Sequence, residues 1–381
     1  MRIAINTRFL LAHKMEGFGW YTYEIVKRMV EKHPEHTFLF FFDRPYEQHF
    51  IFAENVEPIV LRPAARHPFL FVWWFEVAVA SALKKHKADV FFSPDGYLSL
   101  RTTIPQVAVI HDLNFEHYPK DVPWLVRKYY NYFFPRFARK AAHIITVSET
   151  SKQDIIQQYS IAPSRISAVW NSASELYVPL EESVKEKIRA NLTYGNSYFL
   201  FVGSLHPRKN LKRLLSAYLN YQKEGGTNDL VIVGTPMWKN DPEIAKNQNA
   251  HIHFMGYLGI ERLTQVMGAA ACLVYVPYFE GFGIPLVEAM KCGVPIIAGN
   301  RSVLPEVAGT AAMYVDPFSV EEITQKLHLI ENQDYLREEL ASKSLSRGKL
   351  FDWNKSAEQC FDIILRIAKT NFKQITLFKC S

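Results

Sequence analysis

A repeating order of elements constrains the fold of this chain more than any other feature. Short, mostly apolar runs, such as residues 2–5, 198–202 and 269–276, end in glycine-containing or polar loops, and a helical pattern follows each loop. Continuous apolar runs are typical of strands buried on both faces of a parallel sheet, and the alternation with helices is typical of α/β domains. The order occurs twice, on either side of a connection near residues 174–180, within the segment 172–196, which contains polar and charged residues. The sequence therefore predicts two doubly wound, Rossmann-like domains, 1–175 and 176–350, followed by helices over 351–381.

Composition narrows the class of protein. Hydrophobic residues make up 48% of the 381 residues, enough for two folded cores, and the net charge of +6 is too mild and too dispersed to indicate nucleic-acid binding. No apolar run reaches ~18 residues, and residues 6–8 interrupt the first one, so we expect neither a membrane span nor a signal peptide. We expect a cytoplasmic protein with reduced thiols and no zinc site, because the cysteines show no ligand spacing. They are Cys272, Cys292, Cys360 and Cys380.

The segment 275–299 contains the most suggestive loop. A strand end is followed by Glu280-Gly-Phe-Gly283, and a short helix then carries Glu288. The two glycines let a backbone approach a ligand, and a helix start favours a diphosphate. A carboxylate accepts hydrogen bonds from neighbouring hydroxyls, so the two glutamates suit a ribose and a sugar. A βαβ unit with two solvated glutamates explains the segment equally well.

Cationic and glycine-containing loops recur in the second half. Gly203 ends the strand 198–202 and is followed by Arg208 and Lys209, and Gly234 ends another strand. A guanidinium and an ammonium beside a helix start can hold a diphosphate by charge. Since no Asp-x-Asp pair is present, we expect no metal ion.

The first half offers a second set of loops. Gly17 and Gly19 precede the helical pattern 20–32, but a third glycine is missing, which disfavours a nicotinamide cofactor. A loop that a phosphate or sugar can approach is compatible with this pattern. Asp95, His111 and Asp112 follow predicted strands, at the edge where open parallel sheets bind ligands. The alternative for the last two is a capping aspartate beside a structural histidine.

Residues 62–87 combine the aromatic run 69–75 with flanking Arg, His and Lys side chains. Such a helix can lie on an anionic membrane surface, or it can be a core helix with a charged end. The core interpretation is favoured.

Two motifs together resemble a known family. The segments 201–211 (FVGSLHPRKNL) and 280–288 (EGFGIPLVE) resemble the retaining nucleotide-sugar glycosyltransferases of family 4, the second being that family's Glu-x7-Glu motif. Segments 109–113, 146–149 and 302–306 fall in the family's order as well. The resemblance implies the GT-B fold, with two Rossmann-like domains facing across a cleft. It also implies an N-terminal acceptor-binding domain, a C-terminal nucleotide-sugar-binding domain, and final helices that cross back to the first domain.

The resemblance also implies roles. Arg208 and Lys209 would neutralise the donor diphosphate. Glu288 would bind the ribose hydroxyls, and Glu280 would bind the hydroxyls of the transferred sugar. Many members carry an arginine where this chain has Ser204. The implied catalytic residues are His111, Glu280, Lys209 and Arg208. The implied acceptor contacts are Asp95, His111 and Asp112. The implied donor contacts are Gly17, Gly19, Gly203, Ser204, Arg208, Lys209, Gly234, Glu280, Gly281, Phe282, Gly283, Ile284, Leu286 and Glu288.

The function implied is transfer of a hexose, with retention, from a nucleotide sugar to a glycan or lipid-linked glycan in surface polysaccharide synthesis. GDP-mannose is the expected donor and a UDP-sugar the alternative. No cofactor or metal and no nucleic-acid partner is expected. Peripheral contact with the inner face of the cytoplasmic membrane stays open. Two other functions stay open: a nucleotide-sugar hydrolase or epimerase using His111 and Asp112, and a non-catalytic nucleotide-sugar-binding subunit.

Overall fold

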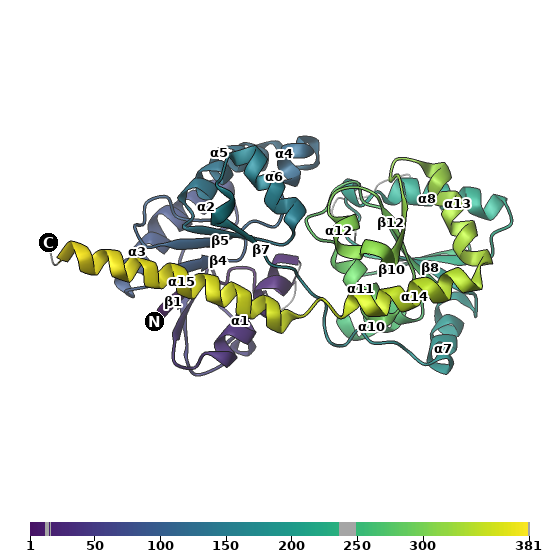
Figure 1. The fold of residues 1–381 in the computed structure, drawn as a ribbon, viewed down its shortest axis with the longest axis horizontal. Helices are drawn as coiled ribbons and strands as arrows, with labels where there is room; N and C mark the ends of the chain where they lie inside the picture. Colours follow the sequence, from purple (N-terminus) through teal and green to yellow (C-terminus); the bar gives the residue numbers. More distant parts are fainter. Residues whose placement is uncertain (12–14, 16, 236–248, 380–381) are drawn as a thin grey trace. The chain divides into compact units, whose positions relative to one another are not determined.

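The computed structural model describes residues 1–11, 15, 17–235 and 249–379. The chain divides into two compact units, each described by itself below (Figure 1). The first unit contains residues 1–171 and 353–381, and the second contains residues 172–352. The domain boundaries predicted at 175/176 and 350/351 lie close to these divisions.

A parallel sheet forms the centre of the first unit. Each neighbouring pair of its strands is parallel. The interior strands are buried, as in β2, where Phe38 to Phe42 are all buried. The strands are β1 (Arg2–Asn6), β2 (Thr37–Phe42), β3 (Val56–Val60), β4 (Val90–Ser93), β5 (Gln106–Val109), β6 (His143–Thr146) and β7 (Ile166–Ala168). Their order in the sheet is β3-β2-β1-β4-β5-β6-β7.

Helices cover this sheet, and one of them comes from the far end of the chain. Helix α15 (Trp353–Lys379) packs against α1 (Gly17–Lys32) and runs along the first unit, drawn in yellow in Figure 1. The α1 residues Tyr21, Ile25 and Met29 recur at a helical period and are buried. The other helices of this unit are α2 (Pro68–Trp73), the π-helical η2 (Trp74–Val79), α3 (Ala80–Lys85), α4 (Asn114–His117), α5 (Trp124–Lys140) and α6 (Glu149–Tyr159), with short 3-10 turns η1 (Gln48–Phe50), η3 (Pro119–Asp121) and η4 (Pro163–Arg165).

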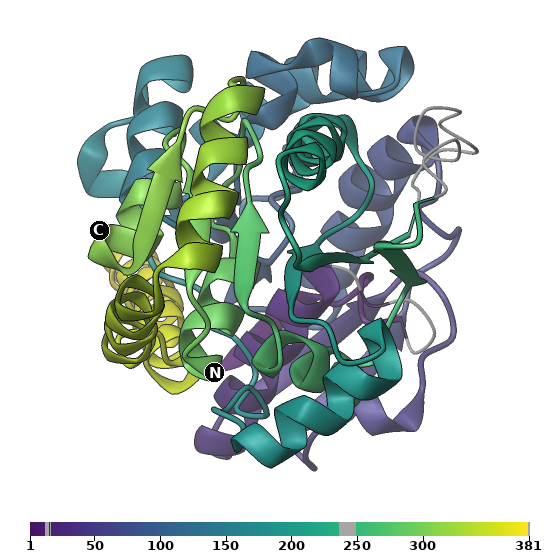
Figure 2. The ribbon, with the colours of Figure 1, turned by 90° about the vertical axis from the view of Figure 1, so that its right-hand side faces the viewer.

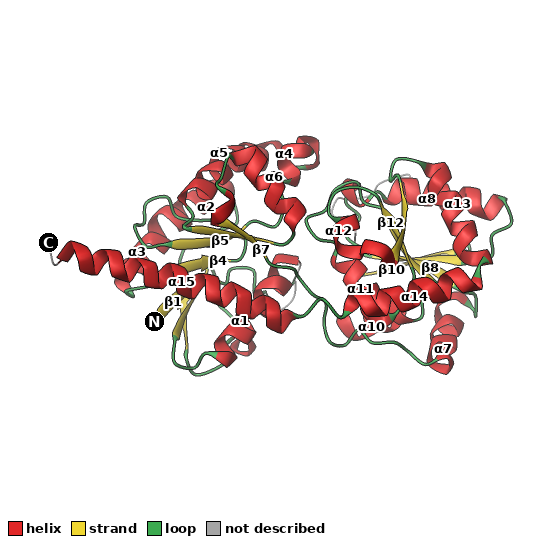
Figure 3. Ribbon diagram, viewed as in Figure 1, coloured by secondary structure: helices red, strands yellow, loops and turns green. Residues whose placement is uncertain are grey.

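The second unit repeats this architecture with its own sheet and core (Figure 2). The strands are β8 (Tyr198–Val202), β9 (Asp229–Val233), β10 (Ile252–Gly256), β11 (Cys272–Tyr275), β12 (Ile296–Gly299) and β13 (Ala312–Val315), in the order β10-β9-β8-β11-β12-β13. The helices are α7 (Glu182–Thr193), α8 (Leu211–Lys223), α10 (Ile260–Gly268), α11 (Ile284–Cys292), α12 (Leu304–Ala308), α13 (Val320–Asn332) and α14 (Asp334–Gly348), with 3-10 turns η5 (Pro207–Lys209) and η6 (Gly309–Ala311). Figure 3 shows strands enclosed by helices in both units, so the predicted α/β class is confirmed.

Each sheet has a point where the strand order reverses. It lies between β1 and β4 in the first unit and between β8 and β11 in the second. The connections that follow the two strands run to opposite sides of the reversal point. The loops at the carboxyl ends of these strands therefore separate and leave space for a ligand. We therefore expect the site residues to lie at these two points.

The cysteines are compatible with the expected reduced state. Cys272, Cys292 and Cys360 are buried free thiols, and Cys380 lies outside the described residues. Within the part of the chain that the structure describes, no helix is long and apolar enough to cross a bilayer.

Candidate active site

Two loops meet at the reversal point of the second unit. One follows β8 and includes η5, and the other follows β11 and leads into α11. The Tyr278 N–H donates to the Arg208 carbonyl at 3.1 Å, and Arg208 Nη1 donates to the Phe279 carbonyl at 3.2 Å. The segments 203–210 and 276–283, far apart in sequence, thus form one surface.

Close backbone contact shapes the first of these loops. The Gly203 N–H donates to the Val233 carbonyl at 3.0 Å, and Gly234 lies so near that a Cβ on it would meet the Gly203 oxygen at 1.8 Å. No side chain fits at position 234. The Lys209 methylenes lie over Gly203, and Ser204 is partly buried beside it. Gly203 and Gly234 therefore set the position of the lysine.

A cluster of three charged side chains lies where the loops meet. Glu280 Oε1 is 2.6 Å from both Arg208 Nη1 and Lys209 Nζ. The Glu280 side chain is 8% exposed and that of Lys209 10% exposed, so solvent screens this cluster weakly. Burial acts to raise the pKa of Glu280, but the charges of Arg208 and Lys209 outweigh this effect and lower the pKa to about 2. Glu280 is therefore ionised at neutral pH and cannot act as an acid there.

Neighbouring side chains fix this cluster in place. Lys209 Nζ donates to the Tyr275 hydroxyl at 2.7 Å. The Asn210 amide donates to the carbonyls of Val276 and Pro317 at 2.9 and 2.6 Å, which ties the loop after β8 to the loop after β11. Ser302 Oγ donates to the Glu280 carbonyl at 2.6 Å. The roles of Tyr275, Asn210 and Ser302 were not predicted.

Glu288 lies one turn into α11, apart from the charged cluster. Its Oε1 accepts a hydrogen bond of 2.9 Å from the Tyr177 hydroxyl. Burial raises the pKa of Glu288 to about 7, although the Tyr177 hydrogen bond and the charge of Lys209 lower it. The two glutamates of the motif therefore differ in chemistry: Glu280 is held as a carboxylate, and Glu288 titrates near neutrality.

The segment between the glutamates is compact. Gly281, Phe282 and Gly283 are buried, and the Phe282 ring contacts the Phe351 ring edge-on with centroids 5.9 Å apart. Gly283, with φ +89°, is the residue before α11, so the Ile284 N–H has no intrahelical partner, and Pro285, which follows it, has no N–H. Leu286, by contrast, is wholly buried and its N–H donates to the Gly283 carbonyl. Leu286 therefore belongs to the core rather than to a surface that a donor can reach.

A buried ion pair occupies the reversal point of the first unit. Arg8 Nε donates to Asp95 Oδ2 at 2.7 Å, and these side chains are 4% and 2% exposed. Asp95 Oδ1 accepts from the Asn6 amide at 2.9 Å and from the Ser93 hydroxyl at 3.0 Å. The Arg8 guanidinium also lies 4.2 Å from the centre of the Tyr97 ring. Asp95 is thus the counter-ion of Arg8 and has no open oxygen for an acceptor, contrary to the expectation for this residue.

His111 lies nearby, at the end of β5. Its Nε2 donates to the Pro94 carbonyl at 2.8 Å, and the rings of Phe18 and Tyr21 contact the imidazole edge-on. Burial lowers the pKa of His111, so the ring is neutral at pH 7. With the proton on Nε2, Nδ1 is left as an acceptor. Asp112 Oδ1 accepts the N–H of Asn114, the first residue of α4, while Leu113 is the N-cap residue, so Asp112 has a local structural role close to the capping role considered as the alternative.

Gly17 and Gly19 form the first turn of α1 rather than a loop before it. Gly17 is exposed, whereas a Cβ on Gly19 would come 2.7 Å from the Phe9 carbonyl. Gly19 therefore permits close packing, and the expectation of a glycine loop is wrong.

The structure thus brings Gly203, Arg208, Lys209, Gly234, Glu280 and the start of α11 together in the second unit. His111 and Asp95 lie together in the first. Within the described residues, no group of three or more His, Cys, Asp or Glu side chains is placed to hold a metal ion.

Comparison with known proteins identifies the family. A family model described as "Glycosyl transferases group 1" matches residues 184–347, and one described as "Glycosyltransferase Family 4" matches residues 15–173. The chain is 30% identical over 291 residues to O-antigen chain mannosyltransferase B of Escherichia coli, covering 74% of this chain and 75% of that protein.

Solved structures agree in fold. WaaG, a glycosyltransferase involved in lipopolysaccharide biosynthesis, matches with a TM-score of 0.76 at 18% identity over 95% of this chain and 99% of its own. Anabaena Alr3699/HepE, solved in complex with UDP and glucose, matches with a TM-score of 0.73 at 18% identity over 95% and 98%. Family models on both halves, a relative at 30% identity and these folds lead to one conclusion: the chain belongs to the group 1 glycosyltransferases of family 4 and has the GT-B fold.

Proposed function

We propose that the chain transfers mannose from GDP-mannose, with retention, to a glycan or lipid-linked glycan in surface polysaccharide synthesis. The observation that carries the proposal is the pairing of Arg208 and Lys209 at the reversal point of the second sheet. The choice of mannose rests on the relative that is named an O-antigen mannosyltransferase. A UDP-sugar is the alternative donor.

Charge at this cluster supports binding and departure of a diphosphate. Two cations share one carboxylate, Glu280, which leaves a net charge of +1 for the donor. As the glycosidic bond breaks, negative charge accumulates on the leaving nucleoside diphosphate. Cations already fixed by Tyr275 and the Phe279 carbonyl would stabilise that charge without reorganising. We therefore propose that no metal ion is needed.

The two glutamates suit binding better than covalent catalysis. Glu280 is ionised and held by two cations, so it is a weak nucleophile but a good acceptor for hydroxyls of the transferred sugar. One oxygen of Glu288 accepts a hydrogen bond from Tyr177, and its carboxylate would accept hydrogen bonds from the ribose hydroxyls. Retention would then follow from attack on the same face from which the diphosphate leaves, with the leaving phosphate accepting the acceptor's proton.

The first unit supplies the proposed acceptor side. His111 is neutral, its Nε2 is engaged by Pro94, and its carbonyl accepts from Ser151 Oγ at 3.2 Å. Asp112 is engaged at the start of α4. A hydrolase or epimerase would need His111 and Asp112 as a free acid and base. Both side chains are held by hydrogen bonds to the backbone, which favours a transferase in which His111 contacts the substrate through Nδ1.

Turnover with defined donors tests the proposal. The protein is incubated with GDP-mannose or UDP-glucose, with and without a lipid-linked glycan fraction, and products are identified by mass spectrometry and by NMR of the new anomeric centre. We expect acceptor-dependent transfer from GDP-mannose with retained configuration and no effect of EDTA. Equal release of free sugar without acceptor would identify a hydrolase, and binding without turnover would identify a non-catalytic subunit.

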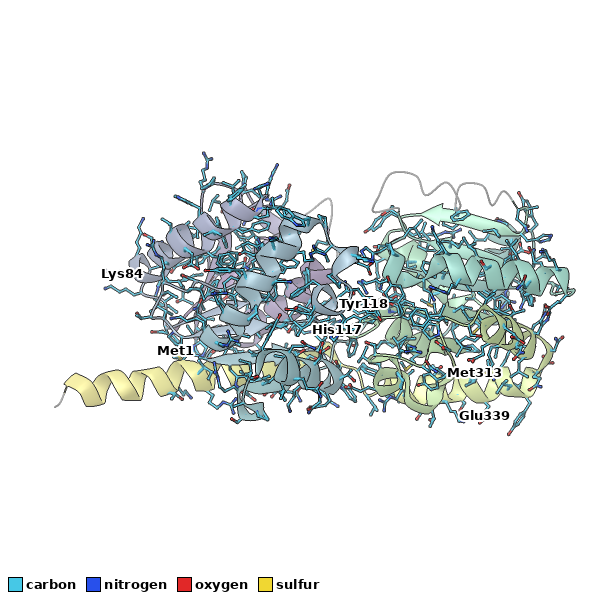
Figure 4. All side chains as sticks on the ribbon, turned by 90° about the horizontal axis from the view of Figure 1, so that it is seen from above. Met1, Lys84, His117, Tyr118, Met313 and Glu339 are labelled. Atoms are coloured by element: carbon cyan, nitrogen blue, oxygen red, sulfur yellow. The ribbon has the colours of Figure 1, made fainter. Side chains whose placement is uncertain are left out.

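We also propose that the first unit binds an anionic membrane surface. The core interpretation of residues 69–75 is confirmed for Trp74 and Phe75, which are buried, but it is wrong for Phe69 and Trp73, which are 73% and 44% exposed. The joined helices α2, η2 and α3 end in exposed lysines, of which Lys84 points away from the ribbon (Figure 4).

Helix α5, which contacts α2, presents a similar surface. Trp124 and Tyr132 are 61% and 53% exposed, and each carries a cation over its ring: Lys128 at 5.0 Å and Arg136 at 3.6 Å. Exposed aromatic rings beside lysine and arginine match the interface and headgroups of an anionic bilayer.

Flotation with vesicles tests this surface. We expect the protein to float with phosphatidylglycerol vesicles but not with phosphatidylcholine vesicles, and Trp73→Ser with Trp124→Ser to weaken flotation. Tyr194→Ser with Tyr335→Ser, which changes two aromatic residues of the second unit that are 92% and 78% exposed, is the matched control. Equal flotation of both double variants would contradict the assignment of the surface.

A further inference from the structure

The first of the two chain segments that connect the units is anchored on the donor-site helix. Residues 169–181 join β7 to α7 without forming a helix or strand. Leu176 and Val178 are 53% and 50% exposed, yet Tyr177 between them is only 2% exposed. A large aromatic side chain turned inward from an otherwise exposed connection indicates a specific contact.

That contact is with α11. The Tyr177 hydroxyl donates to Glu288 Oε1 at 2.9 Å, and Lys291 Nζ donates to the Ala173 carbonyl at 2.9 Å. Glu288 and Lys291 are three positions apart, so they lie on one face of the helix. The connection therefore holds α11 at two points on the face that carries the proposed ribose contact.

We infer that Tyr177 is a positioning residue of the donor site, whose hydroxyl orients the Glu288 carboxylate to accept the ribose hydroxyls. The inference rests on the proposed function, because it takes Glu288 as the ribose contact. Within the residues that the structure describes, Tyr177 is the only hydrogen-bond partner of the Glu288 side chain. One oxygen is oriented by the tyrosine, and the other stays available to a ligand.

The electrostatic surroundings add a pH signature. The groups that face Glu288 are Tyr177 from the connection, Lys209 from η5, Tyr275 from β11 and Cys292 from its own helix. Burial raises the pKa of Glu288 to about 7, and the Tyr177 hydrogen bond opposes that rise. Loss of the hydroxyl should therefore move the pKa of Glu288 further up, so that less carboxylate is present at pH 7.

Tyr177→Phe tests the inference. We expect GDP-mannose to bind about tenfold more weakly at pH 7, the loss typical of a hydrogen bond to a charged group. We also expect the acidic limb of the affinity profile to move to higher pH, and KM for the donor to rise more than kcat falls. UDP-glucose is measured in parallel.

A ligand control separates positioning from general damage. Inorganic pyrophosphate has no ribose, so Tyr177→Phe should leave its affinity unchanged, whereas a disturbed loop would weaken both ligands. Tyr198→Phe is the matched variant, because Tyr198 is also buried in the second unit and donates a 2.7 Å hydrogen bond to the Val266 carbonyl. It should leave the affinity profile unmoved.

The two proposals can fail separately. If Tyr177→Phe binds GDP-mannose with the wild-type affinity and pH profile while Glu288→Ala loses binding, the inference about Tyr177 is overturned and the proposed function stands. Equal weakening of pyrophosphate and GDP-mannose also overturns the inference. If Glu288→Ala binds both donors normally, the ribose role of Glu288 in the proposed function is wrong.

Discussion

Replacing Lys209 with alanine tests the proposed chemistry most directly. The change removes an ammonium that lies 2.6 Å from Glu280 and 2.7 Å from the Tyr275 hydroxyl. Arg208 still pairs with Glu280 after the change, so the carboxylate keeps a partner. The site therefore loses half of its positive charge while its buried anion stays compensated.

The size of the effect follows from this arrangement. Loss of one fixed donor to a developing negative charge typically lowers kcat by about 10²–10³. Since Arg208 remains, we expect the free energy of unfolding to fall by only about 1–2 kcal/mol, less than for a buried charge left alone. A domain of ordinary stability, roughly 5–15 kcal/mol, stays folded after such a loss. Any large fall in turnover is then catalytic.

Steady-state turnover of GDP-mannose and the thermal midpoint Tm are measured on the same preparations. Lys212→Ala, which removes an exposed lysine from α8, is the control and should retain wild-type turnover. Wild-type kcat in folded Lys209→Ala would refute the proposal that this ammonium stabilises the leaving diphosphate.

Three further changes have defined outcomes. The pKa of Glu288 is raised in the folded state, so its contribution to stability is present at low pH and lost as pH rises through about 7. Glu288→Gln should flatten the fall in Tm between about pH 4.5 and 7; an unchanged slope contradicts this. Asp95→Asn leaves the Arg8 charge buried and should lower the free energy of unfolding by about 3 kcal/mol in urea, while GDP binding persists. Gly234→Ala should prevent folding of the second unit, because its Cβ would meet the Gly203 carbonyl; a wild-type circular dichroism spectrum and Tm would contradict this.

The interior strands could be predicted from sequence, and so could the edge strands β7 and β10, but two other edge strands could not. The run Tyr198–Val202 is buried throughout, so its apolar pattern coincides with β8. By contrast, β3 and β13 were not predicted, and both are edge strands of their sheets. In β3, exposed Glu57 and partly buried Pro58 interrupt the apolar pattern, because one side of an edge strand faces solvent.

The same distinction applies to the candidate site. Arg208, Lys209 and Glu280 could be predicted because short motifs place them in loops after strands. No local pattern identifies the partners, since Tyr275 meets Lys209 across 66 positions and Tyr177 meets Glu288 across 111. Asp95 was misassigned for a related reason: its buried counter-ion, Arg8, lies 87 positions away.

The division of the first unit between the two ends of the chain has a consequence for synthesis. Residues 172–352 are continuous, so the second unit can fold as soon as they leave the ribosome. The first unit must wait for α15, whose Trp353 and Phe361 cover Tyr21 and His33. At about 5–20 residues per second, that wait lasts roughly ten to forty seconds. The unit that is synthesised first is thus completed last, and during this interval its uncovered α1 face is where we expect a chaperone to bind.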